Sequence, residues 1–312
     1  LTPLQGPPRA VDFRVSTLPT LFGEKVVIRI LEGGLQRWTL DELGYTPAQE
    51  QALLAAIAKP QGMVLVTGPT GSGKTVSLYA CLELLNQRAL NISTVEDPCE
   101  IHLSGVNQVN VNERVGLTFA MALRALLRQD PDVLMVGEIR DLETADVALK
   151  AAQTGHLVLS TLHTNDAPGV ITRLRHMGVL PFHIASSVSL VTAQRLLRRL
   201  CPLCKIPQTW SNKDLLAAGM RARDLSGSVE PHVLCQPVGC PSCHQGYKGR
   251  LGVYQVMPMS EALQQIVLRD GHAIELASQA AQEGMLTLRQ AAWMQALAGL
   301  TSLAEVLQTT PD

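Results

Sequence analysis

Apolar residues gather in short runs between residues 60 and 200, and longer stretches with a helical period separate these runs. The runs are rich in β-branched residues and are bounded by Gly, Pro and Asp, which is typical of buried strands. Strands that alternate with helices in this way predict an α/β domain built on a mainly parallel sheet. The predicted strands cover residues 63–67, 92–96, 133–137 and 156–162.

The patterns on either side of this region are different. Two β-rich stretches, Val11–Val15 and Lys25–Leu31, open the chain and are joined by a Pro/Gly turn. The first residue is Leu1 and this segment reads like the middle of a domain, so we expect that upstream sequence is missing. A helix is predicted over Pro47–Lys59. Beyond residue 250, the apolar spacing predicts helices around 260–270, 273–283, 287–298 and 302–307.

A glycine-rich loop follows the first predicted strand and precedes the predicted helix Val76–Leu85. Its residues are Gly68, Pro69, Thr70, Gly71, Ser72, Gly73, Lys74 and Thr75. The glycines permit positive φ, so successive N–H groups can point at an anion, and the helix start adds its positive dipole end. This arrangement predicts a phosphate-binding loop for ATP. Lys74 would reach the β- and γ-phosphates, and the Thr75 hydroxyl would take one Mg²⁺ position.

Polar residues follow the later strands, where they can reach the same crevice. Glu138 ends the apolar run 133–137 and is a candidate for orienting Mg²⁺ or activating the attacking water. Glu96 and Glu100 follow the second strand and are rivals or helpers for that role. His163 follows the last strand, a place that favours a γ-phosphate sensor, although a lone histidine is often structural.

Two Cys-x-x-Cys pairs lie 35 residues apart. Their members are Cys201, Cys204, Cys240 and Cys243. Each pair has the local spacing that tetrahedral Zn²⁺ requires, although the gap between the pairs is wider than usual. A redox dithiol and two unrelated pairs remain open alternatives. Cys235 is a possible substitute ligand, whereas Cys81 and Cys99 are expected to be small buried apolar residues.

Composition and charge narrow the class of protein. The chain has 312 residues, 46% of them hydrophobic, which is ample for buried cores. A formal net charge of -1 gives no basic field for nucleic acid. Seven cysteines do not suggest a disulfide framework. No apolar run approaches the ~20 residues of a membrane span and no signal-peptide pattern opens the chain, so we expect a cytoplasmic protein.

Four segments in order, GPTGSGKT, STVEDPCE, RQDPDVLMVGEIRD and TGHLVLSTLHTN, resemble the Walker A, Asp, Walker B and His boxes of the type II secretion/type IV pilus assembly ATPases. The resemblance implies a homo-hexamer in which ATP lies between an N-terminal domain and a RecA-like domain. Arg14 and Arg29 match that family's N-terminal-domain arginines, which reach the terminal phosphate and supply charge as arginine fingers do. The family works on an inner-membrane platform protein, so the resemblance implies peripheral membrane association through partners.

The resulting fold prediction is α/β, with a RecA-like P-loop NTPase domain at its centre. We expect the end of a PAS-like α+β domain over 1–35, a linker over 36–46, and the ATPase core over 47–200. A tetracysteine zinc-binding subdomain then covers 201–250 and a helical subdomain covers 251–312. Within the resemblance, the four cysteines mark assembly and secretion motors. Gln255 stands where these usually have an acidic residue.

Two functions of other kinds remain open alternatives. A nucleic-acid-translocating motor should show basic, aromatic-containing strips, and a neutral chain with four Phe and four Tyr offers none. A non-hydrolysing regulatory subunit would keep the loop as a relic, but Lys74, Thr75 and Glu138 are intact. The sequence does not separate pilus from secretion pseudopilus, identify the platform partner, or say which of the three glutamates activates water. It is also silent on whether this fragment forms hexamers without the upstream domain.

Overall fold

The computed structural model describes residues 12–31, 39–87, 89–225 and 230–310. Its centre is a seven-stranded sheet with the strand order β11-β8-β3-β7-β6-β4-β5. Every neighbouring pair is parallel except β11 with β8, which is antiparallel. The strands are β3 (Gly62–Thr67), β4 (Ile92–Glu96), β5 (Asn107–Asn110), β6 (Val133–Val136), β7 (Leu157–Leu162), β8 (Val188–Leu200) and β11 (Tyr247–Pro258).

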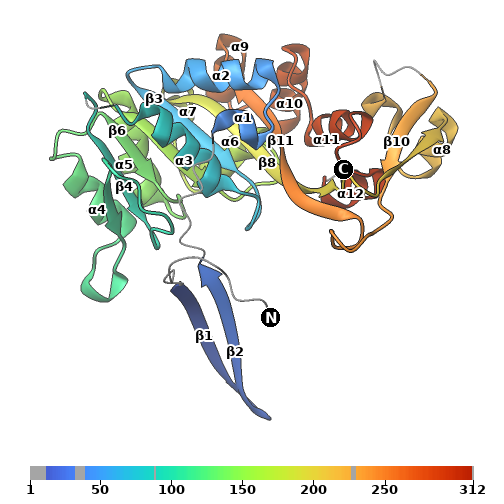
Figure 1. Ribbon diagram of the computed structural model, residues 1–312. Coiled ribbons are helices and arrows are strands. Elements are labelled where there is room, and N and C mark those ends of the chain that lie inside the picture. The colour runs from blue at the N-terminus through green and yellow to red at the C-terminus, as the bar shows by residue number, and fades with distance from the viewer. Residues whose placement is uncertain (1–11, 32–38, 88, 226–229, 311–312) are drawn as a thin grey trace.

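Helices cover both faces of this sheet (Figure 1). Alternate residues of a strand point to opposite faces, and in β3 Met63 and Leu65 enter one core while Val64 and Val66 enter the other. The second core is closed by α1 (Leu40–Leu43), α2 (Pro47–Ile57) and α3 (Lys74–Leu85). The first is closed by α4 (Phe119–Leu126), α5 (Leu142–Gln153), α6 (Pro168–His176) and α7 (Pro181–Ser187). This three-layer arrangement confirms the predicted α/β class.

The C-terminal part of the chain packs at two places. Helices α9 (Glu261–Leu268) and α10 (Ala273–Gln282) lie against α7 and α6. A smaller lobe on the right of Figure 1 contains β9 (Ile206–Trp210), β10 (His232–Gln236), α8 (Asn212–Ala217), α11 (Leu288–Leu297) and α12 (Leu303–Thr309). Short 3₁₀ turns occupy Glu113–Val115 and Ala222–Asp224. Strand β11 joins this lobe to the main sheet and so passes through the predicted boundary at residue 250.

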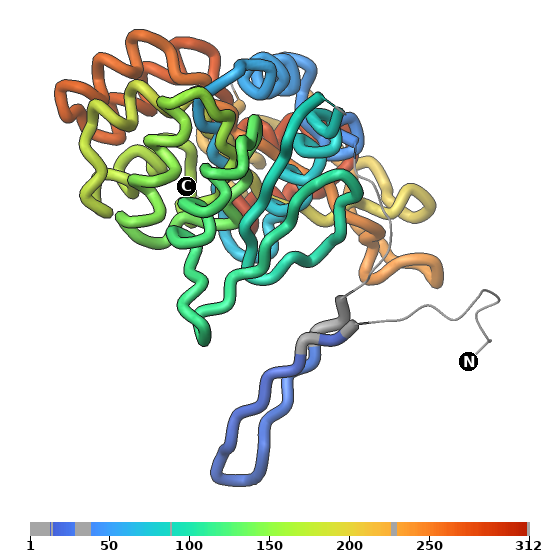
Figure 2. Tube along the Cα trace, turned by 90° about the vertical axis from the view of Figure 1, so that its left-hand side faces the viewer, coloured from blue at the N-terminus to red at the C-terminus, as the bar shows by residue number. Residues whose placement is uncertain are grey.

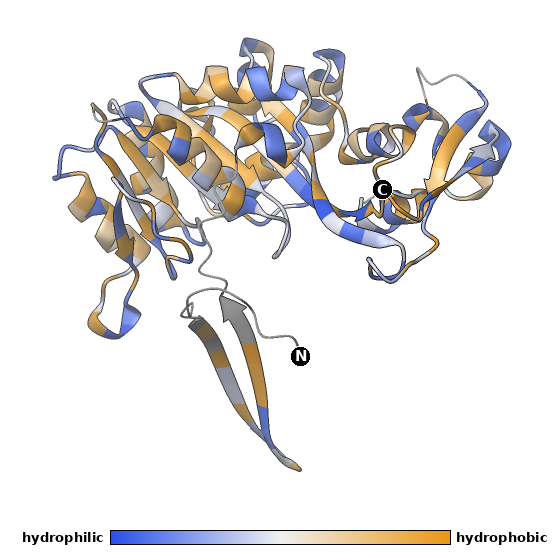
Figure 3. Ribbon diagram, viewed as in Figure 1, coloured by the Kyte–Doolittle hydropathy of each residue, from blue (hydrophilic) through white to orange (hydrophobic). Residues whose placement is uncertain are grey.

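The first described residues form an antiparallel hairpin of β1 (Asp12–Thr20) and β2 (Gly23–Leu31) that extends away from the sheet (Figure 2). The apolar side chains that the structure describes here are exposed, with Leu21 and Phe22 at 97% and 100%, and orange bands mark apolar residues of the hairpin in Figure 3. The backbones of Arg14 and Arg29 pair across the hairpin. Their side chains lie outside what the structure describes, so the predicted phosphate contacts of these arginines stay predictions.

The segment that leads into α2 packs tightly on β11. Tyr45 stacks on Tyr254 with ring centroids 3.6 Å apart, and the Tyr254 hydroxyl donates a hydrogen bond to the Leu43 carbonyl at 3.2 Å. The backbones meet at Gly44 and Gly252, because a Cβ on Gly252 would lie 2.5 Å from the Leu43 oxygen. Residues 39–46 of the predicted linker are therefore part of the folded core.

Most predicted elements agree with the structure to within a few residues, but several strands were not predicted. The four central strands and the helices at 47–59 and 76–85 are present. Strands β5, β8, β9, β10 and β11 have no counterpart in the predicted set. Within the described ranges, no helix combines the length and apolarity needed to cross a bilayer.

Candidate functional site

The glycine-rich loop joins β3 to α3, as the sequence predicts. Gly68, Gly71 and Gly73 all have positive φ, at 150°, 80° and 87°. The loop therefore turns where only glycine is unstrained. Lys74 Nζ donates hydrogen bonds to the carbonyls of Gly68 at 2.9 Å and Pro69 at 3.1 Å. The Lys74 amine therefore lies against the loop, at the place where a phosphate would bind.

Burial lowers the pKa of Lys74, the charge of Glu138 opposes this, and the charge of Arg195 adds to the decrease. The net result is a pKa below the ordinary lysine value. Lys74 begins α3 and Glu138 follows β6, yet the two groups are close enough for the charge of Glu138 to act on the pKa of Lys74. A bound anion at the loop would reverse the balance, because a negative charge favours the protonated amine.

Glu138 follows β6 at the same edge of the sheet as the loop, because β6 and β3 run parallel to the intervening β7. One carboxylate oxygen accepts a hydrogen bond from Arg140, and the other lies 3.5 Å from Nε2 of His163. Burial raises the pKa of Glu138, but the hydrogen bond and charge of Arg140 and the charge of His163 outweigh it. The carboxyl pKa is therefore below its usual value, and the group is ionised at neutral pH.

The residues at the end of β7 complete this edge. The Thr161 hydroxyl donates to the carbonyl of Gly137 at 2.7 Å, which fastens the turn that carries Glu138. His163 is 52% exposed and faces Glu138, and its role as a γ-phosphate sensor stays a prediction. His156, at the opposite end of the strand, contacts the Ala151 carbonyl through Nδ1 at 3.0 Å. Its environment is that of a structural histidine.

The two other glutamates differ in their surroundings. Glu96 is 4% exposed and accepts hydrogen bonds from Tyr79, from Thr94 at 2.6 Å and from Gln108 at 3.2 Å. Burial raises the pKa of Tyr79, so the phenol keeps the proton that it donates. Glu100 is exposed and lines the cleft. Both glutamates line the same cleft. Glu96 is fully hydrogen-bonded, whereas no hydrogen bond to the Glu100 carboxylate is found among the described residues.

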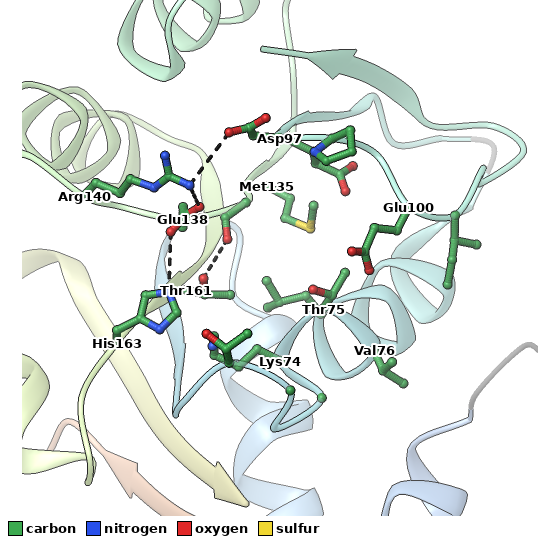
Figure 4. Close-up of a pocket in the computed structure, with 18 of the residues that line it drawn as sticks. Lys74, Thr75, Val76, Asp97, Glu100, Met135, Glu138, Arg140, Thr161 and His163 are labelled. Carbon is green, nitrogen blue, oxygen red and sulfur yellow. Dashed lines mark hydrogen bonds and ion pairs between the residues drawn. The ribbon is translucent and has the colours of Figure 1, made fainter. Parts of the chain in front are cut away.

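These side chains surround one cleft of about 690 Å³. Figure 4 shows Lys74 and Thr75 on one side of it and Glu138 with Arg140 on the other. The apolar floor includes Met135, Phe119 and Leu78. Leu196 on β8 and Arg250 on β11 also line the cleft. The sequence analysis did not assign these two residues to the site. They lie far along the chain from the loop and from the strand ends that predicted it.

The four cysteines of the two pairs form a compact cluster. Their sulfur atoms lie within 4.8 Å of one another, with Cys201 to Cys240 at 3.9 Å and Cys204 to Cys243 at 3.7 Å. Four thiolates around Zn²⁺ at about 2.3 Å place the sulfurs about 3.8 Å apart, so these residues fit a tetrahedral zinc site. Among the described residues, this is the group with metal-binding geometry.

Two further observations concern the cysteines. Desolvation raises the pKa of Cys243, but hydrogen bonds from the Cys240 and Gly246 backbone outweigh it and lower the pKa to about 7. The thiolate that a metal requires is therefore partly favoured by the fold. Cys235 is not in the cluster, and its sulfur lies beside Gly299 instead. The substitution of Cys235 for one of the four ligands, left open by the sequence, is not what the structure shows.

Comparison with known proteins shows the family of proteins to which the chain with this loop, carboxylate and thiol cluster belongs. The profile of the family described as type II/IV secretion system protein matches residues 4–308. The chain belongs to this family. The resemblance found in the four boxes is thereby confirmed, and the family's secretion and pilus assembly branches both appear among the relatives.

The type IV pilus assembly ATPase PilB of Acinetobacter baylyi is 55% identical over 305 residues, covering 97% of this chain and 52% of that protein. PilB of Pseudomonas aeruginosa is 55% identical over 97% of this chain and 53% of its own length. The type II secretion system protein E of Aeromonas hydrophila is 47% identical over 97% of this chain and 60% of its own. The chain thus spans about half the length of the curated relatives it matches.

Solved structures support the fold of this family member. The pilus retraction motor PilT with bound ADP has a TM-score of 0.69 and 28% identity, covering 96% of this chain and 74% of that one. The ATPase DotB of Yersinia pseudotuberculosis has a TM-score of 0.70 at 19% identity, covering 99% and 72%. The second likeness concerns the fold alone.

Proposed function

We propose that this chain is the ATP-hydrolysing part of a motor that powers type IV pilus assembly or type II secretion. The observation that supports this most is the cleft in which the phosphate-binding loop faces an ionised Glu138 from the same sheet edge. A loop that can hold a triphosphate and a carboxylate that can accept a proton are the two parts that hydrolysis needs. The names of the relatives, pilus assembly ATPase and secretion system protein, point the same way.

In this proposal the loop residues 68–75 bind the phosphates through backbone N–H groups, and Lys74 adds a positive charge. Mg²⁺ bound with ATP would supply positive charge to the phosphates, and the Thr75 hydroxyl would be one of the groups that hold it. Thr75 follows Lys74 in the first turn of α3 and lines the cleft, so its hydroxyl is on the required side. Lys74 would exchange its bonds to Gly68 and Pro69 for bonds to phosphate.

Glu138 is our candidate for orienting and deprotonating the attacking water. Its low pKa keeps it ionised, and its contacts with Arg140 and His163 fix its orientation. His163 would sense the terminal phosphate by exchanging this contact for one to the phosphate. Glu100 is the helper at the opposite wall, and Glu96 supports the strand end by its buried hydrogen bonds. Arg14 and Arg29 would complete the site from the hairpin.

The proposed assembly follows from the family rather than from contacts in one chain. We propose a homo-hexamer at the cytoplasmic face of the inner membrane, held there by a platform protein of the machine, with zinc in the tetracysteine cluster. Pilus assembly is placed first, because the pilus relatives from A. baylyi and P. aeruginosa share 55% identity with this chain, against 47% for the secretion protein of A. hydrophila.

The test is Mg²⁺-dependent ATP hydrolysis measured against protein concentration, for the chain and for Glu138→Gln. Removing a general base lowers turnover by about 10²-fold or more. Glu143→Gln is the matched control, since Glu143 is an exposed carboxylate paired with Arg124 outside the cleft. Turnover that rises steeply with concentration and is lost only in Glu138→Gln supports an interface-sited motor. ATP binding without turnover at any concentration would favour a regulatory subunit.

A further inference from the structure

One buried glutamine connects the phosphate-binding loop to the sheet. Gln194 lies on β8, which pairs with β3 so that Thr67 stands opposite Ala193. The next residue along β8 is therefore level with the start of the loop at Gly68. Gln194 is 1% exposed, and a buried amide costs free energy unless its polar atoms are paired. Both ends of its side chain are paired, and both partners belong to the loop or to the helix that follows it.

The Gln194 amide donates a hydrogen bond through its nitrogen and accepts one through its oxygen. Nε2 donates a hydrogen bond to the carbonyl of Ser72 at 2.6 Å, and Oε1 accepts one from the Ser77 hydroxyl at 2.9 Å. A donor and an acceptor are both required, so glutamine is suited to this position and glutamate is not. One side chain thus holds the last turn of the loop and the first turn of α3 at a fixed separation.

The backbone of the same residue limits the loop at its other end. A Cβ on Gly68 would lie 2.6 Å from the Gln194 carbonyl, so strand and loop are in direct contact. The Gln194 carbonyl is itself fixed, because Arg195 Nη1 donates to it at 3.0 Å while Arg195 Nη2 donates to the Asn165 carbonyl at 3.0 Å. Gln194 therefore contacts the loop at Gly68 through its backbone and at Ser72 through its side chain.

We propose that Gln194 is a positioning residue for the phosphate-binding loop. By holding the Ser72 carbonyl, it keeps a partly negative oxygen away from the anion and leaves the neighbouring N–H groups to point inward. The residue does not touch the phosphate in this proposal. Its effect is preorganisation, which strengthens binding by fixing the loop before the ligand arrives. The inference rests on the proposed nucleotide-binding function.

The test compares Gln194→Met with Gln255→Met in the full chain. Methionine keeps the volume and removes both hydrogen bonds. Gln255 is the matched control, because it is also buried, at 5% exposed, and its Oε1 accepts from the Ala167 amide at 2.8 Å, away from the loop. Dissociation constants for Mg–ADP, which is not consumed, are measured with the thermal midpoint and with hydrogen exchange of the loop amides.

We expect Gln194→Met to raise the ADP dissociation constant by about tenfold or more, from the loss of two buried hydrogen bonds. Gln255→Met should stay within about twofold despite a comparable fall in thermal midpoint. Faster exchange confined to residues 68–77 would accompany the first variant only. Equal ADP affinities of the two variants would overturn the proposal, as would unchanged loop exchange in Gln194→Met.

Two further outcomes are distinguishable. Should Gln194→Met not fold, Ser77→Ala removes the bond to Oε1 and leaves the Gln194 bond to the Ser72 carbonyl in place, and the ADP dissociation constant should rise about threefold to tenfold. No change in that variant would overturn the positioning role. Failure of the unaltered chain to bind Mg–ADP would instead reject the proposed function and the inference with it, whereas binding by the unaltered chain and by Gln194→Met alike rejects the inference alone.

Discussion

Oε2 of Glu138 lies 3.5 Å from Nε2 of His163. The two residues follow β6 and β7, which are adjacent and parallel, so the contact spans two strand ends at one sheet edge. Arg140 holds the other carboxylate oxygen and also lies 3.8 Å from Asp97. Glu138 thus already contacts Arg140 and His163 before any nucleotide enters, and Arg140 contributes most to the lowering of its pKa.

Replacing Arg140 by Ala should raise the pKa of Glu138. Burial alone raises it, and Arg140 contributes most to the opposing effect. The acid limb of the ATP turnover profile should therefore move to higher pH, while turnover above pH 8 changes less. The measurement is kcat as a function of pH for the chain and for Arg140→Ala. A limb that stays at the same pH would contradict the assignment of Glu138 as the base.

The same pKa shift has a consequence for stability. A carboxyl with a lowered pKa stabilises the fold above its unfolded pKa of about 4.3, and this contribution is lost as pH falls through the folded value. Arg140→Ala should therefore lose less unfolding free energy than the unaltered chain between pH 5 and pH 3. Arg124→Ala is the control, since Arg124 pairs with the exposed Glu143. Its denaturation midpoints should follow those of the unaltered chain.

Glu96 and Glu100 should separate into a structural and a functional role. Glu96→Ala leaves the buried hydroxyls of Tyr79 and Thr94 without their acceptor, so the unfolding free energy should fall by about 3 kcal/mol. Glu100→Gln changes an exposed side chain and should stay within about 0.5 kcal/mol. Chemical denaturation measures both. Turnover of Glu100→Gln should fall by about tenfold with unchanged stability. Full activity in Glu100→Gln would remove it from the site.

The tetracysteine cluster should hold one zinc ion per chain. Cys204→Ser removes a thiolate and should lower the zinc content, while Cys235→Ser should leave it unchanged because Cys235 lies outside the cluster. A structural zinc site contributes folding free energy on the order of 10 kcal/mol, so a chelator should unfold the lobe of β9 and β10 first. Metal analysis and near-ultraviolet circular dichroism test this. Equal zinc in both variants would contradict the site.

Gly252→Ala should destabilise the fold without touching the cleft. Its Cβ would lie 2.4 Å from the Tyr254 hydroxyl and 2.5 Å from the Leu43 carbonyl, so the backbone must move. The expected loss is about 2–3 kcal/mol. Gly249→Ala is the matched control on the same strand, with open space around it and a φ of 81°, and should cost only about 1 kcal/mol. Urea denaturation of both variants measures the difference.

The sequence predicted the parts of the site that depend on local spacing. The loop at 68–75, the carboxylate after β6 and the histidine after β7 each follow directly from a strand and the turn after it. Parallel strands bring their carboxyl ends to one edge, so the convergence of these residues also follows from the strand pattern. The Cys-x-x-Cys pairs were readable for the same reason, because a metal ligand set has a short and fixed spacing.

Long-range contacts were not predictable in this way. Gln194 contacts Ser72 from a strand more than one hundred residues away, and no local pattern marks it. The antiparallel pair of β8 and β11 was missed because neither strand was predicted, and periodicity alone would not have shown that the two strands are partners. The different roles of Glu96 and Glu100 follow from the hydrogen bonds that Tyr79 and Thr94 donate to Glu96. These contacts exist only in the folded chain, so the sequence alone did not show them.

Strand β11 lies at the border of the sheet, where one row of its backbone groups has no partner strand among the described residues. The Tyr254 carbonyl on that border accepts a hydrogen bond from Gln49 Nε2 at 2.8 Å, and the chain around Gly44 lies against Gly252. The segment of α1 and α2 thus shields an edge to which another chain could otherwise add a strand. A chain shortened to begin after α2 would keep its glycine-rich loop and lose this shield, so it should self-associate through β11.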